Sequence, residues 1–185
     1  MSYVIMIDAD KCSGCQMCEV ACSLRNMKEC NPERSRIRVV KSQLDGQLEF
    51  VPSTCMQCET AMCELVCPVN AISRDIETGA RIISEKKCIG CSSCSYACPF
   101  GACFVDRRLG KSIVCSQCDG DPTCVKVCPS GALTYASADQ VNITLKRGAA
   151  QRLISARAAM QEVVESPKVP EDRDPKPVRC FKCFT

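Results

Sequence analysis

The cysteines of this chain stand in short, regularly spaced groups. One group reads Cys88-Ile-Gly-Cys-Ser-Ser-Cys-Ser-Tyr-Ala-Cys98 and is followed by Pro99, so its gaps are two, two and three residues. This spacing is typical of iron–sulfur cluster ligands, because three close thiolates hold one four-iron cluster and the fourth, beyond a helical turn, serves a second cluster. One such group therefore predicts a pair of clusters.

Sixteen of the twenty cysteines form four quartets of this kind. The quartets are Cys12, Cys15, Cys18 and Cys22; Cys55, Cys58, Cys63 and Cys67; Cys88, Cys91, Cys94 and Cys98; and Cys115, Cys118, Cys124 and Cys128. The first and third have identical gaps and follow a strand pattern and a lysine, whereas the second and fourth follow a hairpin pattern and share Cys-x-Gln-Cys. The sequence is therefore a doubled two-quartet unit.

A shorter repeat follows three of the quartets. Its copies are Pro68-Val-Asn-Ala-Ile72, Pro99-Phe-Gly-Ala-Cys103 and Pro129-Ser-Gly-Ala-Leu133. The first quartet departs from the pattern, because Ser23 rather than proline follows Cys22. Cys103 occupies the slot that Ile72 and Leu133 hold in the other copies, which favours a small buried side chain over a ligand.

The order of the quartets predicts how they exchange their fourth cysteines. Residues 55–99 have the layout of a complete two-cluster ferredoxin, so the second and third quartets are expected to exchange fourth ligands and, by elimination, the first and fourth do the same. The expected ligand sets are Cys12, Cys15, Cys18 and Cys128 (site A); Cys55, Cys58, Cys63 and Cys98 (site B); Cys88, Cys91, Cys94 and Cys67 (site C); and Cys115, Cys118, Cys124 and Cys22 (site D). One pair of sites is then nested inside the other.

The expected cofactors are four [4Fe–4S] clusters, each with four protein ligands. Closed clusters of this kind carry electrons and bind no substrate, so no catalytic residue is expected. Zinc is the main alternative, since all-cysteine zinc sites also use Cys-x-x-Cys pairs. A tetrahedral zinc takes two such pairs, however, whereas each quartet supplies three close cysteines and a displaced fourth.

The composition excludes several other kinds of site. The chain has no histidine, which excludes Rieske centres, Cys-x-x-Cys-His haem attachment and Cys–His or Ser–His nucleophile pairs. Grouped cysteines and an N-terminus without signal-peptide features argue against a disulfide scaffold and indicate a reducing, cytoplasmic setting. No apolar run approaches the length of a membrane span. The formal charge of +3 becomes roughly −5 with four clusters of about −2 each, so no nucleic-acid partner is expected.

Strand and turn patterns predict an α+β fold of two nested bacterial-ferredoxin-like modules with short strands and hairpins. The expected strands are 3–7, 80–84, 133–135 and 141–145, with hairpins over 36–51 and 104–114. The four-cluster domain would be residues 1–145. Its inner module would be about residues 55–99, and its outer module would combine residues 1–54 with 100–145.

The remaining residues have a different character. Residues 146–165 are expected to form a C-terminal helix, because their apolar residues recur at spacings of three and four. This helix either packs on its own domain or docks on another subunit, with self-association as one alternative. Residues 166–185 are expected to form an extended proline-rich arm. Its Cys180 and Cys183 would contact a partner or, with Cys30, form a further metal site.

Basic residues near the quartets are expected to lie mostly on a solvated face, where they offset cluster charge or steer an acidic partner. These residues are Arg34, Arg36, Arg38, Lys86, Lys87, Arg107 and Arg108.

The four quartets resemble those of the iron–sulfur subunits of the dimethyl sulfoxide reductase type over about residues 1–145. That family includes the electron-transfer subunits of molybdenum and tungsten oxidoreductases, nitrate reductase, formate dehydrogenase and formate hydrogenlyase, and it has the same nested pairing. Its members often carry long insertions or a membrane anchor, and neither is evident in this sequence. The compact length, with Ala21-Cys-Ser-Leu-Arg25 and Asn31-Pro-Glu-Arg-Ser-Arg-Ile-Arg38, is similar to small subunits that accompany tungsten enzymes of the aldehyde oxidoreductase family.

The resemblance implies a non-catalytic electron-transfer subunit. Its expected partners are a large catalytic subunit with a tungsten or molybdenum pterin cofactor and a further redox subunit or a ferredoxin or flavin carrier. The alternatives are a free-standing polyferredoxin, an electron-transfer subunit of a formate dehydrogenase or hydrogenase complex, and a zinc-rich interaction module. Metal content and co-purifying subunits distinguish these functions.

Overall fold

The structure is a computed structural model that describes residues 3–44 and 47–137 and, beyond them, positions 139–141, 143, 146, 147, 149–151, 154 and 155. The chain divides into two compact units, Met1–Ile143 and Thr144–Thr185. All the quartet cysteines belong to the first unit.

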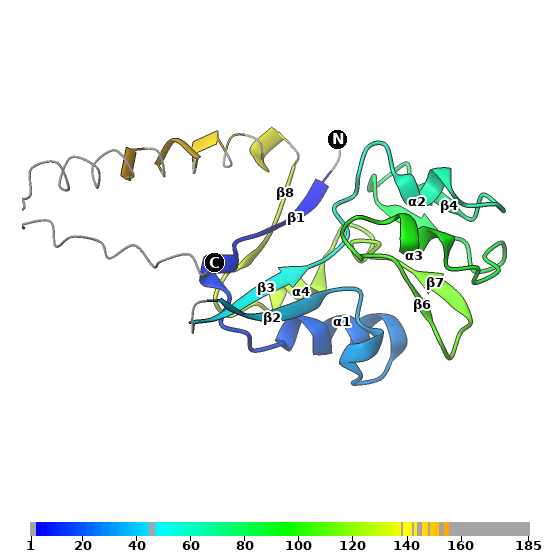
Figure 1. Cartoon of the computed structure of the whole chain (residues 1–185), viewed down its shortest axis with the longest axis horizontal. Helices are drawn as coiled ribbons and strands as arrows, with labels where there is room; N and C mark the ends of the chain where they lie inside the picture. The colour runs from blue at the N-terminus through cyan, green and yellow to red at the C-terminus, as the bar shows by residue number, and fades with distance from the viewer. Residues whose placement is uncertain are drawn as a thin grey trace, which may run out of the picture. The chain divides into compact units, whose positions relative to one another are not determined.

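Short strands and short helices alternate along the first unit (Figure 1). The strands are β1 (Tyr3–Ile7), β2 (Arg38–Leu44), β3 (Gln47–Ser53), β4 (Ile72–Arg74), β5 (Arg81–Ile83), β6 (Phe104–Asp106), β7 (Lys111–Ile113) and β8 (Leu133–Ser137). The α-helices are α1 (Met17–Met27), α2 (Met62–Leu65), α3 (Ser93–Ala97) and α4 (Thr123–Lys126), and the 3-10 helices are η1 (Ala9–Lys11) and η2 (Pro32–Arg34). The fold is therefore a mixed α+β fold built from small elements.

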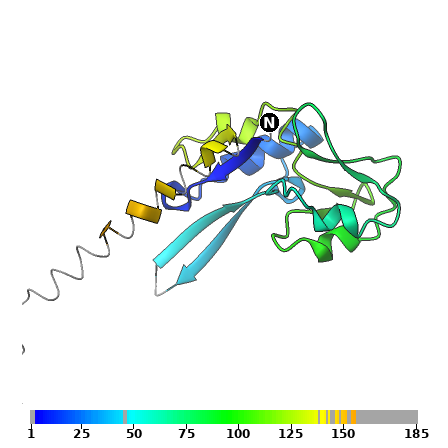
Figure 2. The same ribbon diagram turned by 90° about the horizontal axis from the view of Figure 1, so that it is seen from above.

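The strands form four antiparallel pairs. Three of the pairs join neighbours in the sequence, namely β2 with β3, β4 with β5 and β6 with β7. The fourth joins the first strand to the last, with Tyr3 opposite Ser137 and Ile7 opposite Leu133. Figure 1 shows β1 and β8 side by side, and Figure 2 shows the β2–β3 hairpin projecting from the rest of the unit. All the other strands therefore lie, in sequence, between the two paired strands β1 and β8.

The helices pair in the same nested order. Helix α1 packs against α4, whereas α2 packs against α3. Each helix carries the third cysteine of its quartet, and the fourth cysteine follows one turn later. This explains the constant gap of three residues, because positions i and i+4 lie one helical turn apart. Two cysteines that are close in sequence can thus face two different sites.

Two apolar cores correspond to the two sets of paired elements. The first core contains Ile5, Ile37 and Leu133, so it joins both ends of the unit to its middle. The second core contains Ile72, Cys103 and Val114. Buried cysteines belong to both cores, and Cys55 packs against both of them. Since Cys55 touches both cores, the two groups of elements are continuous with each other.

Several predictions for individual elements can be compared with the structure. Strand β1 has the predicted bounds, and hairpins β2–β3 and β6–β7 confirm the two predicted hairpins. The predicted strand at 141–145 is wrong, because the described positions 141 and 143 have helical backbone. A short β-branched run does not by itself distinguish a strand from a helix.

The C-terminal predictions are only partly covered. Described positions between 146 and 155 have helical backbone, as expected for the start of the predicted helix. The rest of that helix and the arm at 166–185 lie outside the described residues, as do Cys180 and Cys183. The division of the chain at residues 145 and 165 therefore stays a prediction.

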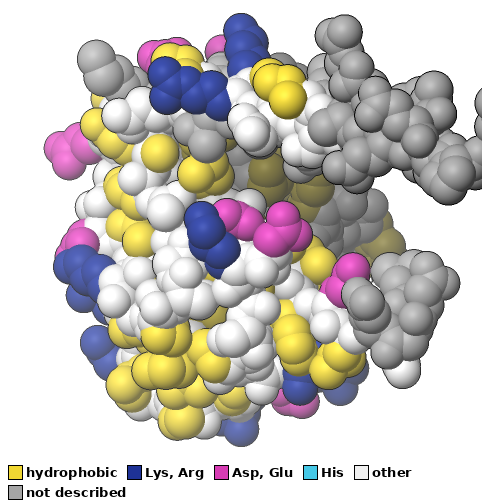
Figure 3. Space-filling view, turned by 90° about the vertical axis from the view of Figure 1, so that its left-hand side faces the viewer, with side chains coloured by type: hydrophobic (Ala, Val, Ile, Leu, Met, Phe, Trp, Pro, Cys, Tyr) yellow, Lys and Arg dark blue, Asp and Glu magenta, His cyan; other side chains and the backbone are white. Residues whose placement is uncertain are grey.

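The surface of the first unit carries apolar side chains. None of the described helices has the length and apolar character that crossing a bilayer requires. Leu65, Ile89 and Tyr96 are exposed by 68%, 61% and 89%, which is high for apolar residues. On the face drawn in Figure 3, apolar side chains gather towards the lower part, between scattered charged ones. Exposed apolar side chains of this kind are common where proteins meet partners.

Candidate metal centres

Three cavities are each lined by four quartet cysteines. The cavity at site A is lined by Cys12, Cys15, Cys18 and Cys128, that at site C by Cys67, Cys88, Cys91 and Cys94, and that at site D by Cys22, Cys115, Cys118 and Cys124. Their empty volumes are similar, at about 310, 290 and 310 Å³ for sites A, C and D. In each cavity three cysteines come from one quartet and the fourth comes from another.

The cysteines of site B also come together. Cys55, Cys63 and Cys98 pack against the second core. Charge interactions link Cys55 to Cys58 and Cys63, and link Cys63 to Cys98, although 35 positions separate the last two. The described structure therefore brings cysteines of two quartets together at three cavities and places Cys63 near Cys98. The assignment of all sixteen cysteines to four sites stays a prediction.

The loop around the second cysteine of a quartet curls tightly. Gly14 and Gly90 have φ of +71° and +70°, and they stand immediately before Cys15 and Cys91. A Cβ atom on Gly14 would collide with the ring of Phe50. A Cβ atom on Gly90 would collide with the carbonyl oxygen of Gly110 in the β6–β7 turn. Both positions need glycine, because of the left-handed backbone and because of the close approach.

Backbone amides point at the sulfur atoms. The Arg36 amide donates to Cys22 Sγ at 3.3 Å, and the Ala71 amide donates to Cys67 Sγ at 3.2 Å. At the buried Ser112, the amide donates to Cys88 Sγ at 3.4 Å and the hydroxyl oxygen lies 3.2 Å from Cys94 Sγ. Hydrogen bonds to sulfur stabilise the thiolate form of cysteine and tune cluster potentials.

The buried thiols resist ionisation without a metal. Burial raises the pKa of Cys18 to about 11 and that of Cys55 to about 12. Burial also raises the pKa values of Cys115 and Cys124. A thiolate is the form that binds metal, and nearby positive charge favours it. These cavities therefore suit thiolates that are accompanied by a positively charged iron centre.

The donor sets fit [4Fe–4S] clusters. At sites A, C and D four cysteine sulfurs line a cavity of similar size, and all eighteen described cysteines are free thiols. Among the described residues, no group of three or more Cys, Asp or Glu side chains is placed to hold a single metal ion. The ligands of a cluster attach to separate iron atoms, so their sulfurs stand farther apart than the ligands of one ion.

Two buried glutamines hold the cluster loops together. The Gln57 amide group donates to the Cys115 carbonyl at 2.8 Å and accepts from the Arg81 backbone amide at 2.7 Å. Gln117 donates to the Tyr3 carbonyl at 2.6 Å, which fixes the fourth quartet to β1. Both glutamines were visible in the sequence as part of the shared Cys-x-Gln-Cys motif. Their hydrogen-bond partners could not be predicted from it.

A buried arginine lies beside site B. The side chain of Arg81 on β5 is 4% exposed and forms an ion pair with Glu64, whose own side chain is 40% exposed. It also donates to the Cys58 and Glu59 carbonyls at 2.7 Å. Arg81 could not be identified from the sequence, because nothing in its sequence neighbourhood indicates burial.

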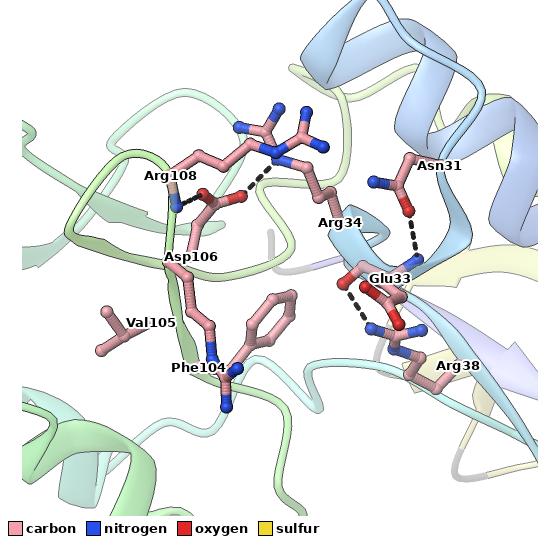
Figure 4. Close-up of a pocket in the computed structure, with 9 residues that line it drawn as sticks. Asn31, Glu33, Arg34, Arg38, Phe104, Val105, Asp106 and Arg108 are labelled. Atoms are coloured by element: carbon pink, nitrogen blue, oxygen red, sulfur yellow. Dashed lines mark hydrogen bonds and ion pairs between the residues drawn. The ribbon is translucent and has the colours of Figure 1, made fainter.

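The basic residues named in the sequence analysis are mostly exposed, as predicted, and Arg34 is an exception. Figure 4 shows a polar cavity in which Arg34 points at Asp106 and Arg38 lies beside Glu33. Arg34 Nε lies 2.5 Å from Asp106 Oδ2, and the two side chains are 14% and 2% exposed. Arg34 and Arg108 both also pair with Glu29. The sequence could not single out Arg34, because its partner Asp106 is far away in the sequence.

The remaining cysteines have separate surroundings. Cys103 is 3% exposed and packs with Ile72 and Val114 in the second core, as expected for a small buried side chain. Burial raises its pKa strongly. Cys30 is exposed. Any site shared by Cys30, Cys180 and Cys183 stays a prediction.

The chain resembles known iron–sulfur proteins over most of its length. Residues 46–140 match the family described as the 4Fe-4S dicluster domain. The chain is 44% identical to the aliphatic sulfonate oxidoreductase polyferredoxin-like subunit of Pyrococcus furiosus, over 67% of this chain and 70% of that protein. It is 40% identical to the putative electron transport protein YsaA of Escherichia coli, over 76% of this chain and 94% of that protein. It is 34% identical to the thiosulfate reductase electron transfer subunit PhsB of Salmonella typhi, over 76% of this chain and 79% of that protein.

Proposed function

The chain belongs to the 4Fe-4S dicluster family of electron-transfer subunits, and on this premise we propose that it carries four [4Fe–4S] clusters for the catalytic subunit of an oxidoreductase complex. It is an electron-transfer protein and a non-catalytic part of such a complex. Three cavities lined by four cysteines each, together with Cys55, Cys63 and Cys98 around the second core, support the proposed number of clusters. When bound, such clusters supply one-electron redox chemistry.

Our proposed ligands are the sets named for sites A, B, C and D. Three cavities with four cysteines each support sites A, C and D, and the charge interaction between Cys63 and Cys98 supports site B. The protein contributes burial, which excludes water, and amide donors such as those of Arg36 and Ala71. Both are known to set cluster potentials.

We further propose two nested ferredoxin-like modules, with sites A and D in the outer one and sites B and C in the inner one. Helix α1 carries Cys18 of site A and Cys22 of site D, and helix α3 carries Cys94 of site C, with Cys98 of site B directly after it. Cys55 of site B packs against the core that holds Cys115 of site D. These contacts support the spatial order A, D, B, C.

The ends of this order are the proposed points of electron entry and exit. Cys15 of site A and Cys91 of site C are exposed, whereas Cys58 and Cys118 of the middle sites are only partly exposed. The exposed Ile89 lies next to the site C loop and lines its cavity. An exposed cluster loop with apolar neighbours suits docking of a redox partner.

The proposed main partner is a large subunit with a tungsten or molybdenum pterin cofactor, and the second is a redox subunit or a ferredoxin or flavin carrier. Relatives named as subunits of a sulfonate oxidoreductase and a thiosulfate reductase support an oxidoreductase partner. We also propose a reducing, cytoplasmic setting, because all described cysteines are free thiols.

Anaerobic purification with metal analysis tests this function. We expect about 16 iron atoms and equal acid-labile sulfide per chain, and a co-purifying large subunit that contains tungsten or molybdenum. Iron at this level without a partner would support a free-standing polyferredoxin instead. Zinc without broad visible absorption would refute both functions.

A further inference from the structure

Arg36 stands where the first quartet departs from the short repeat. In the other three copies, an alanine precedes the buried residue of the repeat: Ala71, Ala102 and Ala132 precede Ile72, Cys103 and Leu133. In the structure, Arg36 and the buried Ile37 take the corresponding place. The Arg36 amide donates to Cys22 Sγ at 3.3 Å, just as the Ala71 amide donates to Cys67 Sγ at 3.2 Å. Arg36 is therefore the structural counterpart of three alanines.

Arg36 is one of the residues that line the cavity of site D, and it also lines a second cavity with Arg38 and Phe104. The cavity of site D is the one formed by Cys22, Cys115, Cys118 and Cys124. One end of the guanidinium group is held, because Nη1 donates to Ser116 Oγ at 2.9 Å. The Nε atom is buried and has no hydrogen-bond partner. A buried N–H without a partner costs free energy unless an acceptor is supplied.

The charge of Arg36 is also unpaired in the described part of the chain. No carboxylate there forms an ion pair with it, whereas Arg34, Arg81 and Arg108 all have one. The other two four-cysteine cavities, at sites A and C, have no charged residue in their linings. Site D therefore has an arginine in its wall whose charge no neighbouring carboxylate offsets.

We propose that the Arg36 guanidinium group donates into site D and raises the reduction potential of the cluster held there. This inference rests on the proposed function, because it requires a cluster at site D. Reduction adds a negative charge to the cluster, and a fixed positive charge in a poorly solvated site stabilises that state. The sulfur atoms of a cluster and its ligands also provide the acceptor that Nε lacks.

The test is a potentiometric titration of the full chain with its clusters, purified anaerobically and followed by electron paramagnetic resonance. Arg36→Ala introduces the residue that the other three copies carry, so it is compatible with the local backbone. We expect one transition to move to lower potential, by at least a tenfold change in the ratio of reduced to oxidised cluster, which equals about 59 mV for one electron. The transition belongs to site D when it is absent from a Cys118→Ala variant.

Three further variants separate charge from structure. Arg36→Gln keeps a polar side chain without the charge, and it should lower the same transition. Arg36→Lys keeps the charge, and it should restore much of the wild-type potential. Arg38→Ala is the matched control, because Arg38 lies over the Phe104 ring at 5.9 Å and does not line site D. It should leave all the transitions unchanged.

The outcomes distinguish this inference from the proposed function. A wild-type protein that lacks four iron–sulfur clusters would refute the function itself. Four clusters with a site D transition that stays at the wild-type potential in both Arg36→Ala and Arg36→Gln would refute only the role of Arg36. An equal shift in Arg38→Ala would refute it as well. If Arg36→Ala loses iron, the Arg36→Gln result decides.

Discussion

Arg34 Nε lies 2.5 Å from Asp106 Oδ2, although the two residues are 72 positions apart. Arg34 ends the short helix η2 after the first quartet, and Asp106 ends β6 before the fourth. Their ion pair therefore connects the region of α1 to the β6–β7 hairpin, as Figure 4 shows. Asp106 also accepts from the backbone amides of Arg108 and Leu109 at 2.9 Å, so its carboxylate is held from several sides.

Removal of this ion pair should make the clusters easier to lose. We expect Arg34→Met to release iron several-fold to thirtyfold faster in moderate urea, because it leaves the buried carboxylate of Asp106 without its main charge partner. The measurement is the anaerobic decay of visible absorption in the presence of an iron chelator. Arg107→Met is the matched control, since Arg107 lines the same cavity and has no ion pair in the described residues. Equal decay of the two variants would contradict the prediction.

The stabilisation by Arg34 should disappear in acid. Burial raises the pKa of Asp106, but hydrogen bonds from Arg34, Leu109 and Arg108 outweigh it and leave the pKa below its usual range. A lowered folded-state pKa means that the stabilisation is complete above the unfolded value of about 3.9 and is lost as the pH falls through the folded value. The difference in iron-release rate between wild type and Arg34→Met should therefore be constant from pH 7 to about 5 and shrink below about 4. A difference that stays constant to the lowest pH measured would show that Asp106 is not responsible.

Cys98 should belong to a different site from its own quartet. We expect Cys98→Ser to lose about four of roughly 16 iron atoms and the signal of site B, while site C keeps its four cysteines. Iron and sulfide analysis with Mössbauer or electron paramagnetic resonance spectra measures this. Cys103→Ser is the control, because Cys103 is buried in the same core but belongs to none of the four sets. Loss of the site C signal in Cys98→Ser would refute the exchange of ligands.

Arg81 and Glu64 should affect site B in opposite directions. We expect Arg81→Met to lower the site B potential and Glu64→Gln to raise it, each by about 30–60 mV, or a three- to tenfold change in the reduced fraction. The reason is that the first change removes a buried positive charge and the second removes its partly exposed counter-ion. Potentiometric titration of both variants measures the two shifts. A purely structural role would instead shift both in the same direction or release iron from both.

Gly90 should tolerate substitution less than Gly101. Both have positive φ, so alanine at either position costs about 1–2 kcal/mol in backbone strain. At Gly90 the new Cβ would also collide with the carbonyl oxygen of Gly110, whereas at Gly101 it would meet no atom within 4 Å. We expect Gly90→Ala to release iron at least tenfold faster than Gly101→Ala, in the same chelator assay. Similar rates would mean that the β6–β7 turn moves aside without cost.

The sequence predicted those features that depend on local spacing. The quartets, the β2–β3 hairpin and strand β1 all follow from patterns within a few residues. Helix α1 was not predicted as a long helix, because the first quartet is followed by a segment without the proline repeat of the others. Residues 23–35 make up that segment, and within it α1 continues to Met27. After it, Ile37 takes the place in the core that belongs, in the other three copies, to the residue after the alanine of the repeat.

The roles of the arginines could not be predicted from local sequence. Arg34, Arg36 and Arg38 alternate along one segment, and such a pattern is typical of a solvated face. The structure gives each a different neighbour: Asp106 for Arg34, the site D cavity for Arg36 and the Phe104 ring for Arg38. Each of these contacts includes residues that are far away in the sequence, so only the tertiary structure distinguishes the three side chains.

The pairing of β1 with β8 also affects the order in which the protein can be completed during synthesis. Ile7 cannot pair until Leu133 has been synthesised, whereas Ile72 pairs with Ile83, which follows after a short turn. At ribosomal speeds of about 5–20 residues per second, the thiols around Cys12 stay without Cys128 for on the order of ten seconds. The inner strands can therefore form while the chain is still growing, and the outer strands close last around them. The first cysteines to leave the ribosome are thus among the last to find their complete surroundings, and they stay longest as thiols without a full set of neighbours.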